Sequence, residues 1–496
     1  MMRGMRRNGA EMRGAVVADE HDGPVAGRAR AADAVVADLL VGLRRDGGDP
    51  LRRQLAAELR EAIRAGRLRT GVRLPASRAL AAQLGVSRGV VTDAYEQLGA
   101  EGWLAARRGA GTVVAAAPGS PPAREESAPR RSVRADFTPT TPDVAQFPRR
   151  LWARAIAHAA ATAPDAALDY GDGHGAGPLR DALAGYLGRV RGTAATPGSI
   201  VVCAGYHQAI VLLCAVLAQR GARRIAFEDP SLPDHWDTAV RAGLEPVAVP
   251  VDDGGLRVDA LAATGAGAVV ATPSHQYPTG AVMGPQRRHA LLAWAREGGR
   301  LIVEDDYEAE FRYDRRPLAA LQGLDPEHVA YVGTTAKTLA PGLRLGWVLA
   351  PAAVAPALAA EKLAADHGSP ALDQLALAHL IESGELDRHL RRVRRAYAER
   401  RGRLVAALGA AIPEARIAGA AAGVHLVLAL PHPLDEERLQ AAAAAAGVVV
   451  RTVEALRREP VADTGARLVL GYGRIPAAGV EAAVAALAAA LRAARS

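Results

Sequence analysis

The sequence predicts two folded units: a small α+β unit built as a helix-turn-helix with a β-wing, followed by a large α/β unit. Residues 49–115 contain helical apolar patterns and an excess of arginine, and residues 116–134 have the Pro-, Ala- and Ser-rich composition of a linker. From 135 to 496, short and nearly all-apolar runs alternate with helical stretches, which favours a parallel-rich sheet buried on both faces. Residues 1–48 are rich in Gly, Arg and Ala and predict a variable, largely disordered tail.

The overall composition favours a cytoplasmic protein with an anionic partner. The chain has 61 Lys+Arg against 53 Asp+Glu, a formal charge of +8, and more than half of this excess lies in 49–115, with eleven arginines and six acidic residues. The two cysteines, Cys203 and Cys214, are too few for a disulfide framework or a metal cluster, which suits a reducing compartment. No apolar run approaches membrane-spanning length, and no signal peptide is evident, so we expect no membrane partner.

The basic unit is predicted to begin with an amphipathic helix whose apolar residues recur at helical spacing: Leu51, Leu55, Leu59 and Ile63. Ser77 and Ser87 are residues of the type that caps helix N-termini, and Gly85 supplies a turn between the two short helices. The second of these helices is expected to bury four residues: Val91, Ala94, Tyr95 and Leu98. Residues 103–114 then read as two strands around a Gly-rich tip, which predicts a wing.

This unit resembles the DNA-binding domain of GntR-family regulators. The resemblance covers GVRLPASR at 71–78, GVSR at 85–88, AYEQL at 94–98 and EGWL at 101–104. It implies a double-stranded DNA operator as partner. Helix starts and wings are where side chains meet phosphates and base edges, so we expect the following contact residues: Arg78, Ser87, Arg88, Thr92, Arg107, Arg108 and Gly109. Gly89 and Val90 stand where the family often has Ser or Thr, which leaves fewer side-chain donors there; a small helical domain that binds protein is the alternative.

Lysine is nearly absent from the chain, and one of the two lysines lies in a segment suited to covalent chemistry. Lys337 and Lys362 are the two, and every other residue among the 61 Lys+Arg is arginine. A lysine amine can deprotonate and form a Schiff base, whereas an arginine guanidinium does neither. Lys337 follows an apolar strand and precedes Arg344 in TTAKTLAPGLR, a layout that suits pyridoxal phosphate (PLP), with an imine-forming amine beside a cation for the phosphate. Lys362 lies in a helical stretch and is predicted to be an ordinary surface lysine.

Two further segments suit the same cofactor. EDDY at 304–307 follows an apolar strand, and a carboxylate behind a pyridine ring keeps its nitrogen protonated. AGYHQ at 204–208 joins a strand-like run to a helix-like run, and backbone N–H groups at such a helix start bind phosphate. Neither signal is specific by itself, but together with Lys337 they predict one PLP site.

From about residue 136 onward the chain resembles fold-type I PLP-dependent aminotransferases, in the form found in the MocR-type subgroup of GntR regulators. The resemblance is carried by the Lys337 segment and by YGDGHG at 170–175, PLR at 178–180, TPSHQYPTG at 272–280, EDDYEAEFRY at 304–313 and RHLRRVRRAY at 388–397. It implies that Lys337 attaches the cofactor, that Asp305 pairs with the pyridine nitrogen and that Tyr307 contacts the ring's 3-oxygen. The remaining cofactor contacts that it implies are Thr334, Arg344, Gly205, Tyr206, His207 and Tyr277.

The resemblance also implies an effector site. Arg467 falls where aminotransferases bind the substrate carboxylate, a task that suits a bidentate guanidinium; a surface arginine at a strand edge is the alternative. Tyr277 replaces an asparagine of classical aminotransferases, and Leu232 stands near the position of an aromatic residue. Both departures argue against efficient transamination more than against cofactor binding.

The sequence therefore predicts a PLP-dependent, DNA-binding transcription regulator of MocR type. We expect a homodimer, because aminotransferases dimerise, and an effector that is an amine or amino acid and exchanges with Lys337. Aminotransferase activity is expected to be vestigial or limited to a half-reaction. Two alternatives stay open: a working aminotransferase that carries a DNA-binding domain, and a sensor of PLP itself that controls vitamin B6 synthesis.

Overall fold

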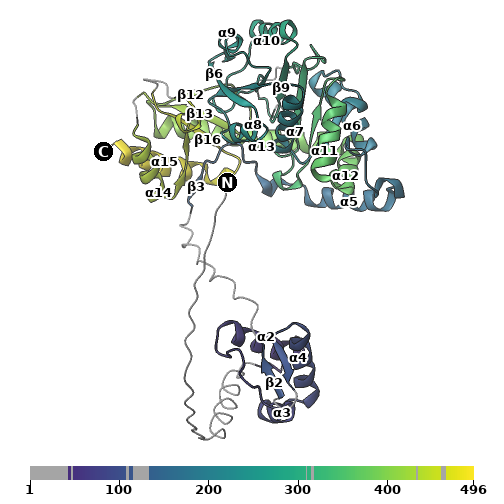
Figure 1. The fold of residues 1–496 in the computed structure, drawn as a ribbon. Helices are drawn as coiled ribbons and strands as arrows, with labels where there is room; N and C mark the ends of the chain where they lie inside the picture. The colour runs from purple at the N-terminus through teal and green to yellow at the C-terminus, as the bar shows by residue number, and fades with distance from the viewer. Residues whose placement is uncertain are drawn as a thin grey trace, which may run out of the picture. The chain divides into compact units, whose positions relative to one another are not determined.

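The computed structural model describes residues 43–45, 48–107, 111–115, 133–308, 310–313, 318–431, 434–459 and 465–495. The chain divides near residue 130 into two compact units, which are described separately (Figure 1). Most of the predicted tail (1–48) and of the predicted linker (116–134) lies outside the described residues.

The described residues of the small unit form three helices and a two-stranded antiparallel sheet: α2 (Leu51–Arg64), α3 (Ser77–Leu84), α4 (Arg88–Ala100), β1 (Leu104–Arg107) and β2 (Gly111–Val114). Leu59, Leu80 and Leu98 have no exposed surface, so one apolar core joins the three helices. A helix-turn-helix followed by a β-wing is thus the architecture of this unit.

The capping residues predicted for the helices of the small unit are confirmed in part. Gly85 ends α3 in the left-handed region at φ 62°, and Ser87 Oγ accepts a hydrogen bond from the Val90 N–H at 3.4 Å. The prediction that Ser77 is an N-cap is wrong, because Ser77 is already helical and Ala76 occupies the cap. Tyr95 is only partly buried, and its hydroxyl donates a hydrogen bond to the backbone carbonyl of Pro75 at 3.0 Å.

The large unit is built on an eight-stranded sheet in the order β4-β11-β10-β9-β8-β5-β6-β7. Its strands are β4 (Ile200–Cys203), β5 (Arg224–Asp229), β6 (Glu245–Asp252), β7 (Gly255–Leu256), β8 (Ala268–Ala271), β9 (Leu301–Asp305), β10 (Val329–Thr334) and β11 (Gly346–Leu349). Seven apolar runs of the sequence predict buried strands, and all of them lie in this sheet: 200–204, 224–227, 246–251, 268–271, 301–303, 329–332 and 345–349. The central pairs are parallel, whereas β11 is antiparallel to both neighbours because a loop rather than a crossover helix connects it to β10.

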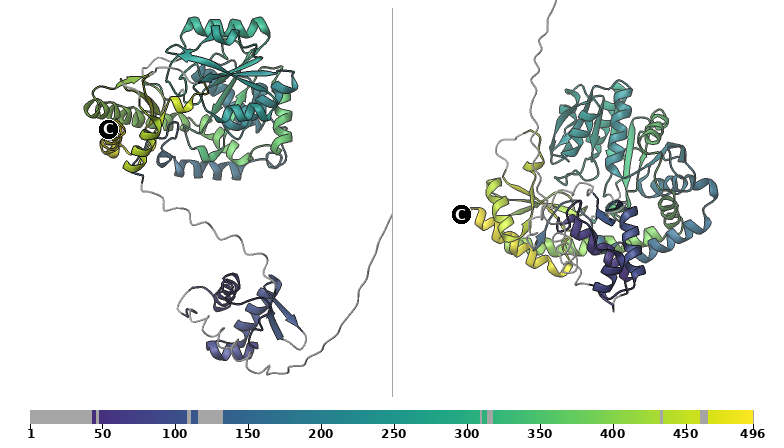
Figure 2. Two further views of the ribbon diagram at one scale, coloured as in Figure 1. Left: turned by 60° about the vertical axis from the view of Figure 1, so that its left-hand side comes forward. Right: turned by 60° about the horizontal axis from the view of Figure 1, so that its bottom comes forward.

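Helices cover both faces of this sheet, which confirms the prediction of a doubly buried sheet (Figure 2). One face packs against α7 (Tyr206–Gln219), α8 (Asp234–Arg241) and α11 (Ala355–Asp366). The other packs against α5 (Arg149–Thr162), α6 (Gly177–Arg191), α9 (Val258–Ala262), α10 (Pro285–Gly298) and α12 (Ala371–Glu382). Side chains alternate along the strands: Val201 faces the first layer, and Val202 faces the second.

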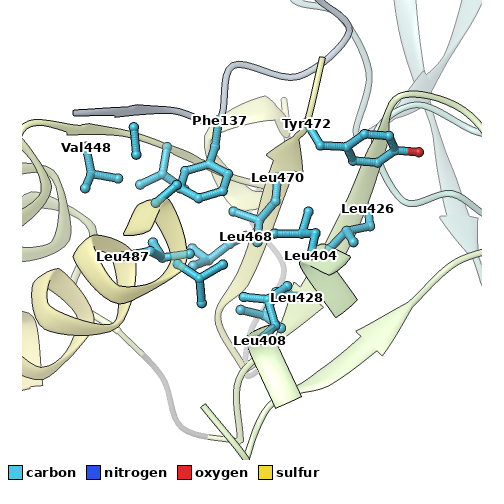
Figure 3. Packing of buried hydrophobic residues seen from close by; sticks show 14 of the residues in the cluster. Phe137, Leu404, Leu408, Leu426, Leu428, Val448, Leu468, Leu470, Tyr472 and Leu487 are labelled. Carbon is cyan, nitrogen blue, oxygen red and sulfur yellow. The ribbon is translucent and has the colours of Figure 1, made fainter. Parts of the chain in front are cut away.

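A second, four-stranded antiparallel sheet lies in the C-terminal part of the large unit. Its order is β12 (Arg416–Ala418), β13 (His425–Ala429), β16 (Arg467–Gly471) and β15 (Arg451–Thr452), and it packs with α13 (Glu385–Ala411), α14 (Glu436–Ala446) and α15 (Val480–Arg495). Figure 3 shows Leu404 of α13, Leu468 of β16 and Leu487 of α15 meeting in one apolar core. The entry strand β3 (Ala135–Asp136) pairs in parallel with β14 (Val448–Val449), which brings Phe137 into the same core.

One helical segment, Ala477–Arg495, has the length and apolar composition of a membrane span, with a mean hydropathy of 1.5. The expectation that no apolar run approaches membrane-spanning length did not anticipate this segment. This segment includes α15, whose Val484, Leu487 and Leu491 pack in the core beneath the second sheet, so packing within the unit accounts for its apolar face.

Candidate cofactor site and DNA-binding helices

A cavity of about 220 Å³ opens beside the ends of β4, β9 and β10 in the large unit. Open α/β sheets commonly bind ligands at such strand ends. The structure brings to this cavity all nine residues that the sequence suggested for a cofactor: Gly205, Tyr206, His207, Tyr277, Asp305, Tyr307, Thr334, Lys337 and Arg344. These residues come from segments far apart in the sequence, so their convergence is a property of the fold.

Lys337 follows β10 and lines the cavity as a half-buried side chain. Burial lowers the pKa of its amine from the usual value, while the charges of Glu308 and Asp305 oppose this effect. Within the described part of the chain, the Lys337 amine has no hydrogen-bond or ion-pair partner. An amine in this setting loses its proton more easily than an exposed lysine does, as a nucleophile requires.

Asp305 ends β9 and supplies the clearest test of whether a pyridine ring fits the cavity. Its Oδ1 is buried and has no hydrogen-bond partner among the described residues. Burial, and next the neighbouring charge of Asp306, raise the pKa of this carboxyl well above its usual value. A buried carboxyl without a partner is costly, and a protonated ring nitrogen is a cation that would relieve it. The donor set therefore fits PLP.

The segment between β4 and α7 is shaped to receive an anion. Gly205 precedes α7 at φ 84°, and Gly346 lies so close that an added Cβ would approach the Gly205 Cα to 2.8 Å. The Arg344 guanidinium comes within 3.5 Å of the place where a Gly205 Cβ would stand. Arg344 itself adopts φ 52°, a rare conformation for a residue with a side chain. A helix start and a nearby guanidinium together suit a phosphate.

Tyr307 is held by a buried polar cluster behind the cavity. Its hydroxyl donates a hydrogen bond to the His275 carbonyl at 3.1 Å. The His275 ring bonds Glu308 Oε1 at 2.7 Å, and Glu308 Oε2 accepts the backbone N–H of Val424 at 2.9 Å. Burial opposes ionisation of Glu308, but the hydrogen bond from His275 and the charge of His425 outweigh it and lower the pKa of Glu308 to about 2, so it is ionised at neutral pH. The ring of Tyr277 meets that of Tyr307 edge-on at 6.4 Å.

Thr140 also lines the cavity and was missed at the sequence level. It is a β-branched residue at φ 60°, an outlier of the kind that functional sites retain. Its segment crosses the end of β16 closely: an added Cβ at Gly471 would meet the Thr138 carbonyl at 2.1 Å, and one at Gly473 would meet the Thr141 carbonyl at 1.9 Å. The Gly-Tyr-Gly sequence at 471–473 was the available signal.

Arg467 differs from its sequence-based description. It lies in β16 and is not among the residues that line the cavity. A guanidinium that is to bind an effector carboxylate would be expected to lack a partner within the protein, but Nη2 of Arg467 pairs with Glu454 Oε1 at 2.9 Å and Nε bonds the same oxygen at 3.1 Å. Glu454 already supplies the negative charge that an effector was expected to bring.

Lys362 is also corrected, because it is buried rather than on the surface. Its side chain has 0% exposure, and its amine pairs with Asp366 Oδ1 at 2.6 Å. The alanine-rich sequence around it gave no sign of this, since the covering surface comes from other elements.

In the small unit, Arg78 and Arg88 are exposed near the starts of α3 and α4, and Ser87 is exposed just before α4. Thr92 lies one turn further along α4, and its hydroxyl donates to the Arg88 carbonyl at 3.0 Å. Of the predicted wing contacts, Arg108 and Gly109 lie outside the described residues, as does the side chain of Arg107. Ser87, Arg88 and Thr92 therefore lie at the N-terminal end of α4, which is where a DNA-reading helix carries its contact residues.

Comparisons with known proteins give the same division of the chain. Residues 51–114 match the family of bacterial regulatory proteins called the gntR family, and residues 142–491 match aminotransferase class I and II. The multiple substrate aminotransferase of Thermococcus profundus superposes with a TM-score of 0.66 at 26% identity, covering 74% of this chain and 92% of that one. The fold and these matches define a helix-turn-helix regulator joined to an aminotransferase-like domain.

Relatives of the whole chain give the family. The pyridoxine biosynthesis transcriptional regulator PdxR of Corynebacterium glutamicum is 34% identical over 81% of this chain and 88% of its own length. The probable rhizopine catabolism regulatory protein MocR of Rhizobium meliloti is 35% identical over 73% of this chain and 78% of its own length. The chain belongs to the MocR-type regulators of the GntR family, which are DNA-binding transcriptional regulators.

Proposed function

We propose that this regulator holds PLP covalently through Lys337 and responds to a small molecule that bears a primary amine. The observation that carries the proposal is the convergence, in one cavity, of the Lys337 amine and the buried Asp305 Oδ1, neither of which has a hydrogen-bond partner among the described residues. When bound, PLP supplies a carbonyl carbon that bonds reversibly to primary amines and a ring that withdraws electrons. A primary amine is therefore the chemical class that competes with Lys337.

Each side chain has a distinct part in this proposal. Asp305 keeps the ring nitrogen protonated, and Tyr307 contacts the ring's 3-oxygen, to which its single O–H donates once it turns away from the His275 carbonyl. Thr334 and Arg344 hold the phosphate together with the backbone of 205–207. Tyr206, His207 and Tyr277 complete the walls of the cavity.

Arg467 remains our proposed anchor for an anionic group of the effector, with one condition set by the structure. Its pair with Glu454 has to open, or to be shared, before a carboxylate binds. The exchange of one carboxylate for another makes effector affinity depend on Glu454. Arg467 can then contact either Glu454 or the carboxylate of the effector, and a conformational switch needs two such alternative contacts.

The output side of the proposal is operator binding by the small unit. Arg78, Ser87, Arg88 and Thr92 contact double-stranded DNA, and we extend the same role to Arg107, Arg108 and Gly109. A homodimer formed by the large units presents two such helices to two half-sites. The protein acts in the cytoplasm, where the operator is found.

Two other functions remain testable. The 34% identity to a regulator named for pyridoxine biosynthesis favours PLP itself as the signal, with control of vitamin B6 synthesis. A working aminotransferase with a DNA-binding domain is the other. Leu232 lines the cavity near the place where relatives carry an aromatic residue, which weakens ring stacking and favours a vestigial or half-reaction activity.

The test uses the scarcity of lysine in the chain. Purified protein with PLP should be yellow, should bleach with borohydride, and should then carry the label on the peptide that contains Lys337. Lys337→Ala should abolish the label. Because the chain has only one other lysine, mapping has a clear alternative outcome: a label on Lys362, or no label, overturns the assignment. Titration of amines and of PLP against operator binding then separates the two signals.

A further inference from the structure

The second lysine of the chain, Lys362, is fully buried. It lies on α11, which packs on β4 and α7 at the edge of the sheet, and its side chain has 0% exposure. A buried ammonium is costly unless it is paired and hydrogen-bonded. In a chain that otherwise uses arginine for positive charge, this residue does something that an arginine side chain does not.

A continuous set of hydrogen bonds leads from Lys362 to the cofactor site. The Lys362 amine donates to Asp366 Oδ1 at 2.6 Å. Asp366 Oδ2 accepts a hydrogen bond from Gln208 Nε2 at 2.7 Å. Gln208 Oε1 in turn accepts the backbone N–H of Ala204 at 2.6 Å. Ala204 directly precedes Gly205, where the anion-shaped segment begins.

The chemistry of each link explains the residue types. The side-chain amide of Gln208 donates to the Asp366 carboxylate and accepts from the Ala204 N–H, so the position of the carboxylate fixes that of this backbone N–H. Asp366 is the last residue of α11 and is also held by the N–H of Gly368 at 2.9 Å. The ammonium is a compact charge on a straight stem, whereas a guanidinium is larger and planar and needs several acceptors. A buried stem whose amine meets one partly exposed carboxylate therefore suits lysine.

We propose that Lys362, Asp366 and Gln208 form a positioning chain that keeps the 204–207 segment ready to receive the phosphate of PLP. None of the three lines the cavity, so they are positioning residues that act through the backbone. The proposal rests on PLP binding at Lys337, and it adds a reason why the phosphate end of the site is preorganised. Its specific consequence is that the three residues influence the phosphate and not the aldehyde or the ring.

The test compares PLP with pyridoxal, which has the same aldehyde and ring but no phosphate. Both are titrated against the full chain stripped of cofactor, and the lysine-linked absorbance is recorded. Lys362→Met should lower PLP affinity by about 10-fold or more, as expected when a charged hydrogen bond behind the site is lost. Pyridoxal affinity should stay within about twofold of the wild type. Gln208→Ala should give the same selective loss, which keeps the test valid if the buried Lys362→Met variant does not fold.

A matched control lies on the same two helices. Gln219 of α7 bonds Glu361 of α11 at 2.5 Å, at the end of α7 remote from Gly205. Gln219→Ala removes a bond between the same elements and should leave both affinities unchanged. Equal losses for PLP and pyridoxal in Lys362→Met and Gln208→Ala would show a general packing role and overturn the proposal, as would no loss at all. If wild-type protein binds neither compound, the proposed function fails instead, so the two failures are distinct.

Discussion

The two units of this chain present their functional side chains in opposite settings. In the small unit, Arg78 and Arg88 are exposed on the first turns of helices, and no described residue pairs with either guanidinium group. In the large unit, Asp305 and Tyr307 are buried, and Asp305 has an oxygen without a partner. An exposed cation is stable with water alone, whereas a buried polar group without a partner is costly. The two sites therefore call for different experiments: ligand binding at the buried site and operator binding at the exposed one.

The largest expected effect lies at the buried site. Asp305→Asn removes the negative charge that pairs with the ring nitrogen, and loss of one partner of a buried pair costs about 3–5 kcal/mol. PLP affinity should fall accordingly, while operator binding without effector is retained. Titration of PLP by absorbance measures the change. Asp181→Asn, at an exposed position of α6, is the control. Wild-type affinity in Asp305→Asn would mean that this carboxylate does not meet the ring.

A core substitution in the small unit tests whether the two units unfold independently. Leu98 has no exposed surface in α4, and truncation of such a side chain costs about 2–5 kcal/mol. In calorimetry, Leu98→Ala should lower the transition of the small unit and leave that of the large unit in place, together with its PLP absorbance. Glu96→Ala, exposed on the same helix, is the control. A common shift of both transitions would contradict independent cores.

Substitution of the exposed arginines should have smaller effects, which are confined to operator binding. Arg88→Ala or Arg78→Ala should weaken operator binding by about 1–3 kcal/mol for a base contact, or should reduce the salt slope by about one for a phosphate contact. Neither should alter thermal stability or the PLP spectrum. Arg52→Ala, exposed on α2, serves as the control in electrophoretic mobility shifts over a range of salt. Unchanged binding in the Arg78/Arg88 double variant would remove α3 and α4 from the interface.

The smallest effect concerns acid stability of the small unit. A hydrogen bond from Arg60, at 2.6 Å, is the main cause that lowers the pKa of Glu101. Because the folded pKa is below the unfolded one, the pair stabilises the fold above about pH 4.5, and this stabilisation is lost as the pH falls through the folded pKa. Glu101→Gln should flatten the acid dependence of the small-unit transition by less than about 1 kcal/mol, since the pair is partly solvated. An unaltered pH profile would show that the pair contributes nothing.

Sequence patterns predicted what depends on local spacing or on long motifs. Seven of the eight strands of the large sheet, the turn at Gly85 and the Lys337 segment follow from apolar runs, glycine positions and motif resemblance. Contacts between distant segments were not predictable in this way. Glu454 meets Arg467, and Asp366 meets Gln208, only because separate elements pack together. Thr140 enters the cavity because Gly471 at the end of β16 and Gly473 just after it admit the neighbouring backbone, a relation that no periodicity encodes.

The close passage of residues 138–141 over β16 makes the first stretch of the large unit part of the cavity wall through Thr140. This stretch is continuous with β3, and before β3 the chain leads back to the DNA-binding unit. A ligand that displaced Thr140 would therefore shift a backbone that continues directly into β3. Through this continuity, occupancy of the cavity would be felt at the first residues of the large unit.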